Sequence, residues 1–209
     1  MKHATLHPGI NLGSHHGTAH DRAETVLFGF WVFLMSDLII FGLMFATYVT
    51  MATPIGMAGG PGPKDAFDLG SILAQTMILL SSSLTFGIAS LAMRHKQSRR
   101  RVALWLCITL GLGLAFLTLE VRDLRHMAEI GAGPSRSGFL SAFWGLVPLH
   151  GLHVTTGCLW IIIMLIQMRI FGMADIIKTR LLRLGLFWHF LDLVWIGIFT
   201  IVYLVGLSA

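Results

Sequence analysis

The chain has 209 residues, of which 55% are hydrophobic and only 12% are charged, and its mean hydropathy is +0.77. Because about a quarter of the residues in an ordinary soluble domain are charged, this composition excludes a soluble globular protein and predicts an integral membrane protein. The formal net charge of +5 is assigned to loops that set membrane orientation, and no nucleic-acid partner is expected.

Residues 1–25 are polar and contain five histidines, without an apolar core followed by a cleavage site. They are predicted to form a solvated N-terminal tail rather than a signal peptide, with loose metal binding by the histidines as the alternative. Residues 26–209 are predicted to form one transmembrane domain. Cys107 and Cys158 lie in apolar runs of that domain and are expected to be buried, unpaired packing residues.

The first predicted span, 26–51, is interrupted only by Asp37 near its centre. An intramembrane carboxylate indicates either a functional group or one that is hydrogen-bonded to another helix. Proline and glycine residues then predict a loop over 53–68. The second span, 69–93, contains no ionisable residue, and the spacing of Ser83 and Gly87 predicts a close approach to a neighbouring helix.

The third predicted span is 102–121, and Glu120 at its end is expected to pair with an arginine at the interface. The fourth, 137–168, is 32 residues long and has no Lys, Arg, Asp or Glu. It carries His150 and His153, which share one helical face because residues i and i+3 are neighbours. Pro148 removes a backbone hydrogen bond beside them and is expected to kink the helix.

The fifth predicted span, 184–207, contains His189 and Asp192, which also have i, i+3 spacing and are candidates for a mutual hydrogen bond. The sequence therefore predicts an all-α bundle of five transmembrane helices. On alternate sides of the membrane the loops and termini hold 11 and 4 Lys plus Arg residues. The positive-inside rule then predicts a cytoplasmic N-terminus and a periplasmic C-terminus.

Three functions are compatible with the polar residues in the spans. Histidines and carboxylates could ligate iron, copper or zinc, although the spans contain only three histidines. A proton-relaying transporter is the second possibility, but no internal repeat is visible. The third is a non-catalytic subunit of a larger membrane complex, in which polar side chains join helices by hydrogen bonds.

Four sequence motifs, in this order and on separate spans, resemble subunit III of the haem-copper oxidases. They are Leu34–Asp37 (LMSD), Ser137–Phe143 (SGFLSAF), His150–Val154 (HGLHV) and Trp188–Asp192 (WHFLD). Within that family the chain is most similar to the five-helix form of cytochrome bo-type ubiquinol oxidases. Asp37 matches an intramembrane carboxylate that is usually Glu in the cytochrome c oxidase branch, and Pro148 departs from the family pattern. Glu120 matches an acidic position at the end of the third span.

The resemblance implies a non-catalytic subunit of an inner-membrane complex that oxidises ubiquinol, reduces oxygen to water and pumps protons. It implies partner subunits I, II and IV, with haems and copper in subunit I, none in this chain, and bound phospholipid between its helices. It further implies a role in proton uptake and sustained turnover, with no catalytic or metal-binding residue here. We expect His150, His153 and Glu120 to form a polar cluster between spans, because their hydrogen bonds must be satisfied without water.

Overall fold

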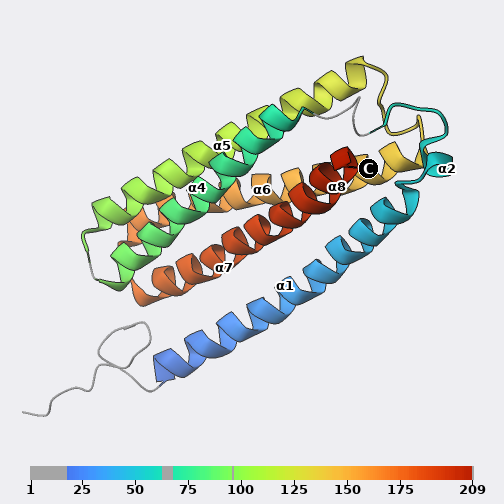
Figure 1. The fold of residues 1–209 in the computed structure, drawn as a ribbon. Helices are drawn as coiled ribbons and strands as arrows, with labels where there is room; N and C mark the ends of the chain where they lie inside the picture. Colours follow the sequence, from blue (N-terminus) through green and yellow to red (C-terminus); the bar gives the residue numbers. More distant parts are fainter. Residues whose placement is uncertain (1–17, 63–67, 96, 209) are drawn as a thin grey trace, which may run out of the picture.

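The computed structural model describes residues 18–62, 68–95 and 97–208, and within those ranges it contains helices and no strands (Figure 1). Five helical segments are long and apolar enough to cross a membrane, which confirms the predicted all-α, five-span fold. The long helices are α1 (Thr18–Met51), α4 (Leu69–Arg94), α5 (Arg99–Glu129), α6 (Gly138–Phe171) and α7 (Asp175–Ile198). The short ones are α2 (Pro54–Met57), the π-helical turn η1 (Phe199–Leu204) and α8 (Val205–Ser208).

The long helices alternate in direction, so Thr18 and Ser208 lie at opposite ends of the bundle (Figure 1). The α4–α5 and α6–α7 connections lie at the end that holds the start of α1. The other end holds α2, the α5–α6 connection and α8. The basic residues at the ends of α4 and α6 and at the starts of α5 and α7 therefore lie at the same end of the bundle.

The helices differ from the predicted spans mainly at their ends. α5 runs on to Glu129 instead of ending at 121, and α7 begins at Asp175 instead of 184, so both continue through charged residues. The apolar run of a sequence marks the part of a helix that fits in hydrocarbon, whereas the helix itself continues into the polar interface. α1 begins at Thr18, inside the predicted polar tail, and the rest of that tail lies outside the described residues.

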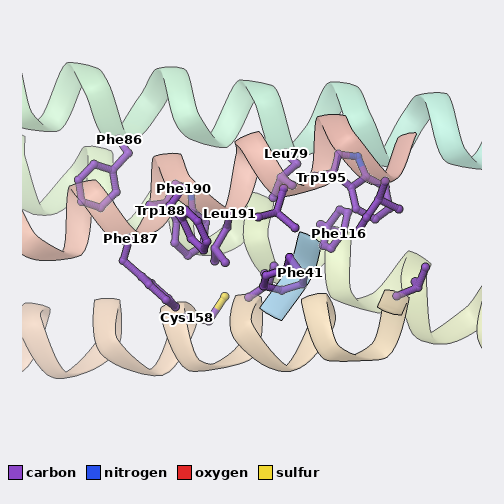
Figure 2. Close-up of a cluster of buried hydrophobic side chains, with 14 of the residues drawn as sticks. Phe41, Leu79, Phe86, Phe116, Cys158, Phe187, Trp188, Phe190, Leu191 and Trp195 are labelled. Atoms are coloured by element: carbon purple, nitrogen blue, oxygen red, sulfur yellow. The ribbon is translucent and has the colours of Figure 1, made fainter. Parts of the chain in front are cut away.

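α7 is the most enclosed of the long helices and α1 the least. α7 presents Trp188 and Trp195 to the other helices, and both are almost fully buried (Figure 2). Each indole N–H donates to a hydroxyl of α4, Trp188 to Ser82 and Trp195 to Thr76, at 3.1 Å in both cases. These bonds satisfy the polar atom of a large apolar side chain in a region without water.

Two glycines make the space that Trp188 occupies. A Cβ added at Gly113 of α5 or at Gly157 of α6 would lie 2.9 Å from the Trp188 ring. Real Cβ contacts of that length essentially do not occur, so both positions require glycine in this packing. The close approach predicted at Gly87 is wrong, because a Cβ added there would meet nothing within 4 Å.

α1 lies along one edge of the bundle and packs mainly against α6 and α7 (Figure 1). The Tyr48 hydroxyl near its end donates to the Val202 carbonyl of η1 at 3.2 Å. This bond joins the end of α1 to the π-helical turn. α6 continues as one helix through Pro148, from Gly138 to Phe171.

Candidate functional site

Asp37 and His153 are brought together in the middle of the bundle. Asp37 comes from α1 and is 9% exposed, and its Oδ2 lies 3.3 Å from Nε2 of His153 on α6. The other ring nitrogen of His153, Nδ1, lies 2.7 Å from the Leu149 carbonyl. A carbonyl only accepts, so Nδ1 carries a hydrogen and donates it. Nε2 is then the ring nitrogen that faces the Asp37 carboxyl group, so the His153 side chain joins α6 to α1.

This pair borders a cavity of about 270 Å³ between α1, α6 and α7. Apart from the pair and one threonine, the cavity is lined by apolar and aromatic side chains: Phe30, Phe33, Leu152, Trp160 and Phe187, with Thr156. A polar pair in apolar surroundings suits a site in hydrocarbon, because a polar side chain without a partner is costly there. The contact between Asp37 and His153 joins the LMSD motif of α1 to the HGLHV motif of α6.

His150 is fully buried and surrounded by aromatic rings. The ring centroids of Trp195, Phe116 and Phe41 lie 5.3, 5.9 and 6.5 Å from that of the imidazole. Neither ring nitrogen has a hydrogen-bond partner. The predicted cluster of His150, His153 and Glu120 is therefore wrong as a hydrogen-bonded unit, since His153 is paired with Asp37 instead. The i, i+3 spacing of His150 and His153 predicts that they share a face of α6, but it does not predict which helix each histidine contacts.

Glu120 lies inside α5 rather than at its end, and it is only 3% exposed. Both of its carboxylate oxygens lack a hydrogen-bond partner. They pack against Gly151 of α6, where an added Cβ would come within 2.7 Å of each. The expected pairing of Glu120 with an arginine is wrong, because Arg122 bonds to the neighbouring Asp123.

His189 and Asp192 do not bond to each other, although they share a face of α7. His189 Nδ1 shares a hydrogen bond of 2.6 Å with the Ser83 hydroxyl of α4. Asp192 is buried beside the same Ser83 hydroxyl. The fourth recognised motif thus joins α7 to α4 through His189.

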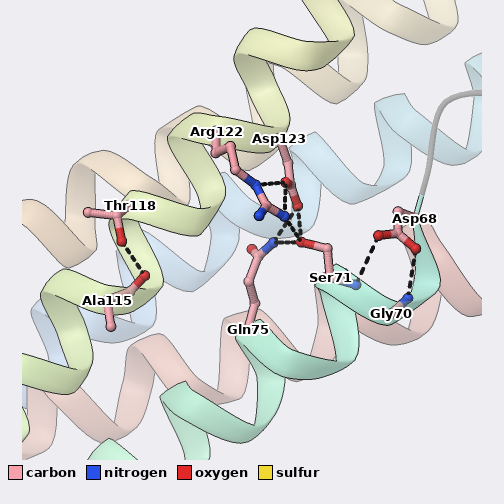
Figure 3. A network of polar contacts seen from close by, with 8 residues as sticks. All are labelled: Asp68, Gly70, Ser71, Gln75, Ala115, Thr118, Arg122 and Asp123. Carbon is pink, nitrogen blue, oxygen red and sulfur yellow. Dashed lines mark hydrogen bonds and ion pairs between the residues drawn. The ribbon is translucent and has the colours of Figure 1, made fainter.

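A polar network that was not predicted from the sequence joins the start of α4 to α5 (Figure 3). Asp123 accepts hydrogen bonds from Ser71 at 2.5 Å and from Gln75 at 2.7 Å, and it pairs with Arg122 at 3.2 Å. Arg122 also donates to the Ser71 hydroxyl at 3.2 Å. Ser71 and Gln75 have i, i+4 spacing, which could have drawn attention to this face, but uncharged residues do not stand out in an apolar span.

The described residues contain no group of three or more His, Cys, Asp and Glu side chains placed to hold a metal ion. Cys107 and Cys158 are both free thiols. Cys158 is buried as expected, whereas Cys107 is exposed on the outer surface of α5, so the expectation of a buried Cys107 is wrong. An outward-facing apolar residue in a membrane span needs no protein partner, because lipid provides the apolar contact.

Comparison with known proteins identifies the family. Residues 7–207 match the family model described as cytochrome c oxidase subunit III. A protein of Pseudomonas aeruginosa named cytochrome bo(3) ubiquinol oxidase subunit 3 is 45% identical over 195 residues, which cover 93% of this chain and 92% of that protein. A protein of the same name from Pseudomonas putida is 45% identical over 187 residues, covering 90% and 89% of the two chains.

A protein of Alkalihalophilus pseudofirmus named cytochrome c oxidase subunit 3 is 40% identical over 198 residues, covering 94% of this chain and 95% of that one. The fold and these matches define a multi-pass membrane subunit of a multi-subunit oxidase. The chain belongs to the cytochrome c oxidase subunit III family.

Proposed function

We propose that this chain is the non-catalytic subunit III of a proton-pumping terminal oxidase that oxidises ubiquinol and reduces oxygen to water. Its role is to support the assembly, lipid binding and sustained turnover of subunit I. The observation that carries the proposal is the match along nearly the whole chain to relatives named as ubiquinol oxidase subunit 3. The Asp37–His153 pair supports a role in which polar side chains join helices.

The proposal includes the surroundings of the chain. Subunits I, II and IV are its partners, subunit I carries the haems and copper, and the complex lies in the bacterial inner membrane. The N-terminus is cytoplasmic and the C-terminus periplasmic, as the distribution of 11 and 4 basic residues favours. The apolar cavity beside Asp37 and His153 has a lining suited to a phospholipid acyl chain.

A second candidate is subunit III of a cytochrome c oxidase, which the 40% identical relative of that name favours. The two candidates differ in the electron donor, which subunits other than this one determine. The relatives with 45% identity favour the quinol branch.

The test is native purification through an affinity tag on this chain, followed by identification of its partners and assay with both donors. We expect co-purification with a large haem-containing subunit and oxidation of ubiquinol but not of reduced cytochrome c. Oxidation of cytochrome c, with copper ligands in subunit II, would establish the second candidate. Purification without a haem-containing partner would contradict both.

A further inference from the structure

A cavity of about 280 Å³ enters the bundle at the end that holds α2 and the α5–α6 connection. It lies between α4, α5, α6 and η1. Three exposed polar residues, Asp68, Arg122 and His126, mark its mouth, and Glu120 lies at its buried end. Its remaining lining residues are Ile72, Gln75, Asp123, Leu124, Met127, Phe143, Val147 and Tyr203.

Glu120 is the lining residue whose carboxylate is not satisfied by any neighbouring side chain. It is 3% exposed, and both carboxylate oxygens lack a hydrogen-bond partner. An ionised carboxylate in that position is costly unless a cation or several donors compensate it. On the side of α6 the Glu120 carboxylate packs against Gly151, which has no side chain that could donate a hydrogen bond. A compensating group can therefore reach Glu120 only through the cavity.

The charged and titratable groups on the surrounding helices leave Glu120 without a cation. On α5, Arg122 is bonded to Asp123, and His126 lies exposed at the mouth. α4 contributes Asp68, whose carboxylate caps its own helix by accepting from Gly70 and Ser71. The other titratable groups near Glu120 are Tyr203 of η1 and His150 of α6. His150 is buried and surrounded by aromatic rings.

The class of ligand follows from the donor set. A metal ion needs several ligands, and no group of three His, Cys, Asp and Glu side chains is assembled in the described part of the chain. A proton needs only one carboxylate oxygen. We propose that Glu120 is a proton-binding site that is reached by water through this cavity, from the side of the membrane that holds the α5–α6 connection.

The cavity has the room and the polar atoms for such a path. A water molecule requires a cavity volume of about 10–15 Å³ and two to four polar partners. The cavity measures about 280 Å³, so it has room for several water molecules. Gln75 and Asp123, which bond to each other (Figure 3), line the same cavity as Glu120 and provide polar partners for water there. This inference depends on the membrane-spanning fold and not on the electron donor of the proposed oxidase.

The first test is access of an impermeant thiol reagent in oriented membrane vesicles that contain the whole complex. In a background of Cys107→Ser and Cys158→Ala, three single variants are compared: Glu120→Cys, Ser135→Cys and Thr109→Cys. Ser135 is exposed in the α5–α6 connection, so Ser135→Cys reports from which side of the membrane the reagent reaches that connection. Thr109 is also on α5 and is 0% exposed, but it does not line the cavity.

We expect Glu120→Cys to be modified from the same side as Ser135→Cys, and Thr109→Cys to stay unmodified from either side. Three results would each overturn the proposal: an unreactive Glu120→Cys beside a reactive Ser135→Cys, reaction from the opposite side, or equal reactivity of Thr109→Cys. Because Ser135→Cys identifies the side of the membrane that holds the α5–α6 connection, the result does not depend on the orientation proposed above.

The second test detects the proton itself by infrared spectroscopy of the purified complex. The wild type should show a protonated carboxylic acid band that shifts in D₂O and is lost in Glu120→Gln. Asp192→Asn removes another buried acid, one that does not line the cavity, and should leave that band in place. An unchanged spectrum in Glu120→Gln, or a Glu120 band that does not shift in D₂O, would contradict the proposal.

Discussion

Oδ2 of Asp37 and Nε2 of His153 lie 3.3 Å apart, and the Leu149 carbonyl orients the imidazole by accepting from Nδ1. α1 and α6 are thereby joined by two polar side chains that partner each other. In hydrocarbon this matters more than the strength of the contact, because interhelical hydrogen bonds contribute only about 0.6–2 kcal/mol while an unpaired charge is far more costly.

Asp37→Asn should leave assembly intact and shorten the functional lifetime of the complex. The asparagine amide can still donate to Nε2 of His153, so the helix contact survives, but an amide cannot ionise or bind a proton as a carboxyl group does. The measurements are the yield of purified complex and the number of turnovers before inactivation. A loss of assembly in Asp37→Asn would show that the role of the carboxylate is structural.

His153→Leu should lower the thermal stability or yield of the complex, by a free energy of about 0.6–2 kcal/mol for the lost interhelical bond. Asp37 would then be a buried carboxyl group without its partner. The double variant Asp37→Leu/His153→Leu, compared with its two single variants, measures the coupling between the two residues. Unchanged yield and stability in His153→Leu would exclude the pair as a helix connection.

At the scale of the helices, Trp188 packs α7 against α5 and α6 by filling the space beside Gly113 and Gly157. Gly157→Ala places a Cβ 2.9 Å from the Trp188 ring. Overpacking of this kind costs about 1–3 kcal/mol, so the melting temperature of the complex should fall.

Gly111→Ala is the matched control, because a Cβ there meets nothing within 4 Å. It should be neutral or raise helix stability by up to about 1 kcal/mol. Equal thermal stability of the two variants would contradict the packing described for Trp188.

The five spans could be predicted because each is an apolar run longer than a bilayer core, and that property is local in sequence. The ends of α5 and α7 could not, since both helices continue through charged residues at the interface. Periodicity places His150 and His153 on one face but does not say that one meets Asp37 and the other a ring of aromatics. Those partners depend on how separate helices pack, which no local pattern encodes.

At the scale of the whole molecule, the basic segments at one end of the bundle predict the orientation. A reporter that is active only after export should be active when it is fused after Ala209, because the C-terminal end of the helices lies opposite the basic α4–α5 and α6–α7 connections. The same reporter inserted between α6 and α7 should be inactive. An inactive Ala209 fusion together with an active insertion between α6 and α7 would reverse the orientation.

The central claim is that this chain supports an oxidase whose chemistry takes place in another subunit. It is tested most directly by purifying the complex with and without this chain and following ubiquinol oxidation through many turnovers. We predict a comparable initial rate per haem in both preparations, earlier inactivation without the chain, and a restored lifetime when the chain is returned. Loss of the initial rate with the haems intact, or an unchanged lifetime, would contradict the account.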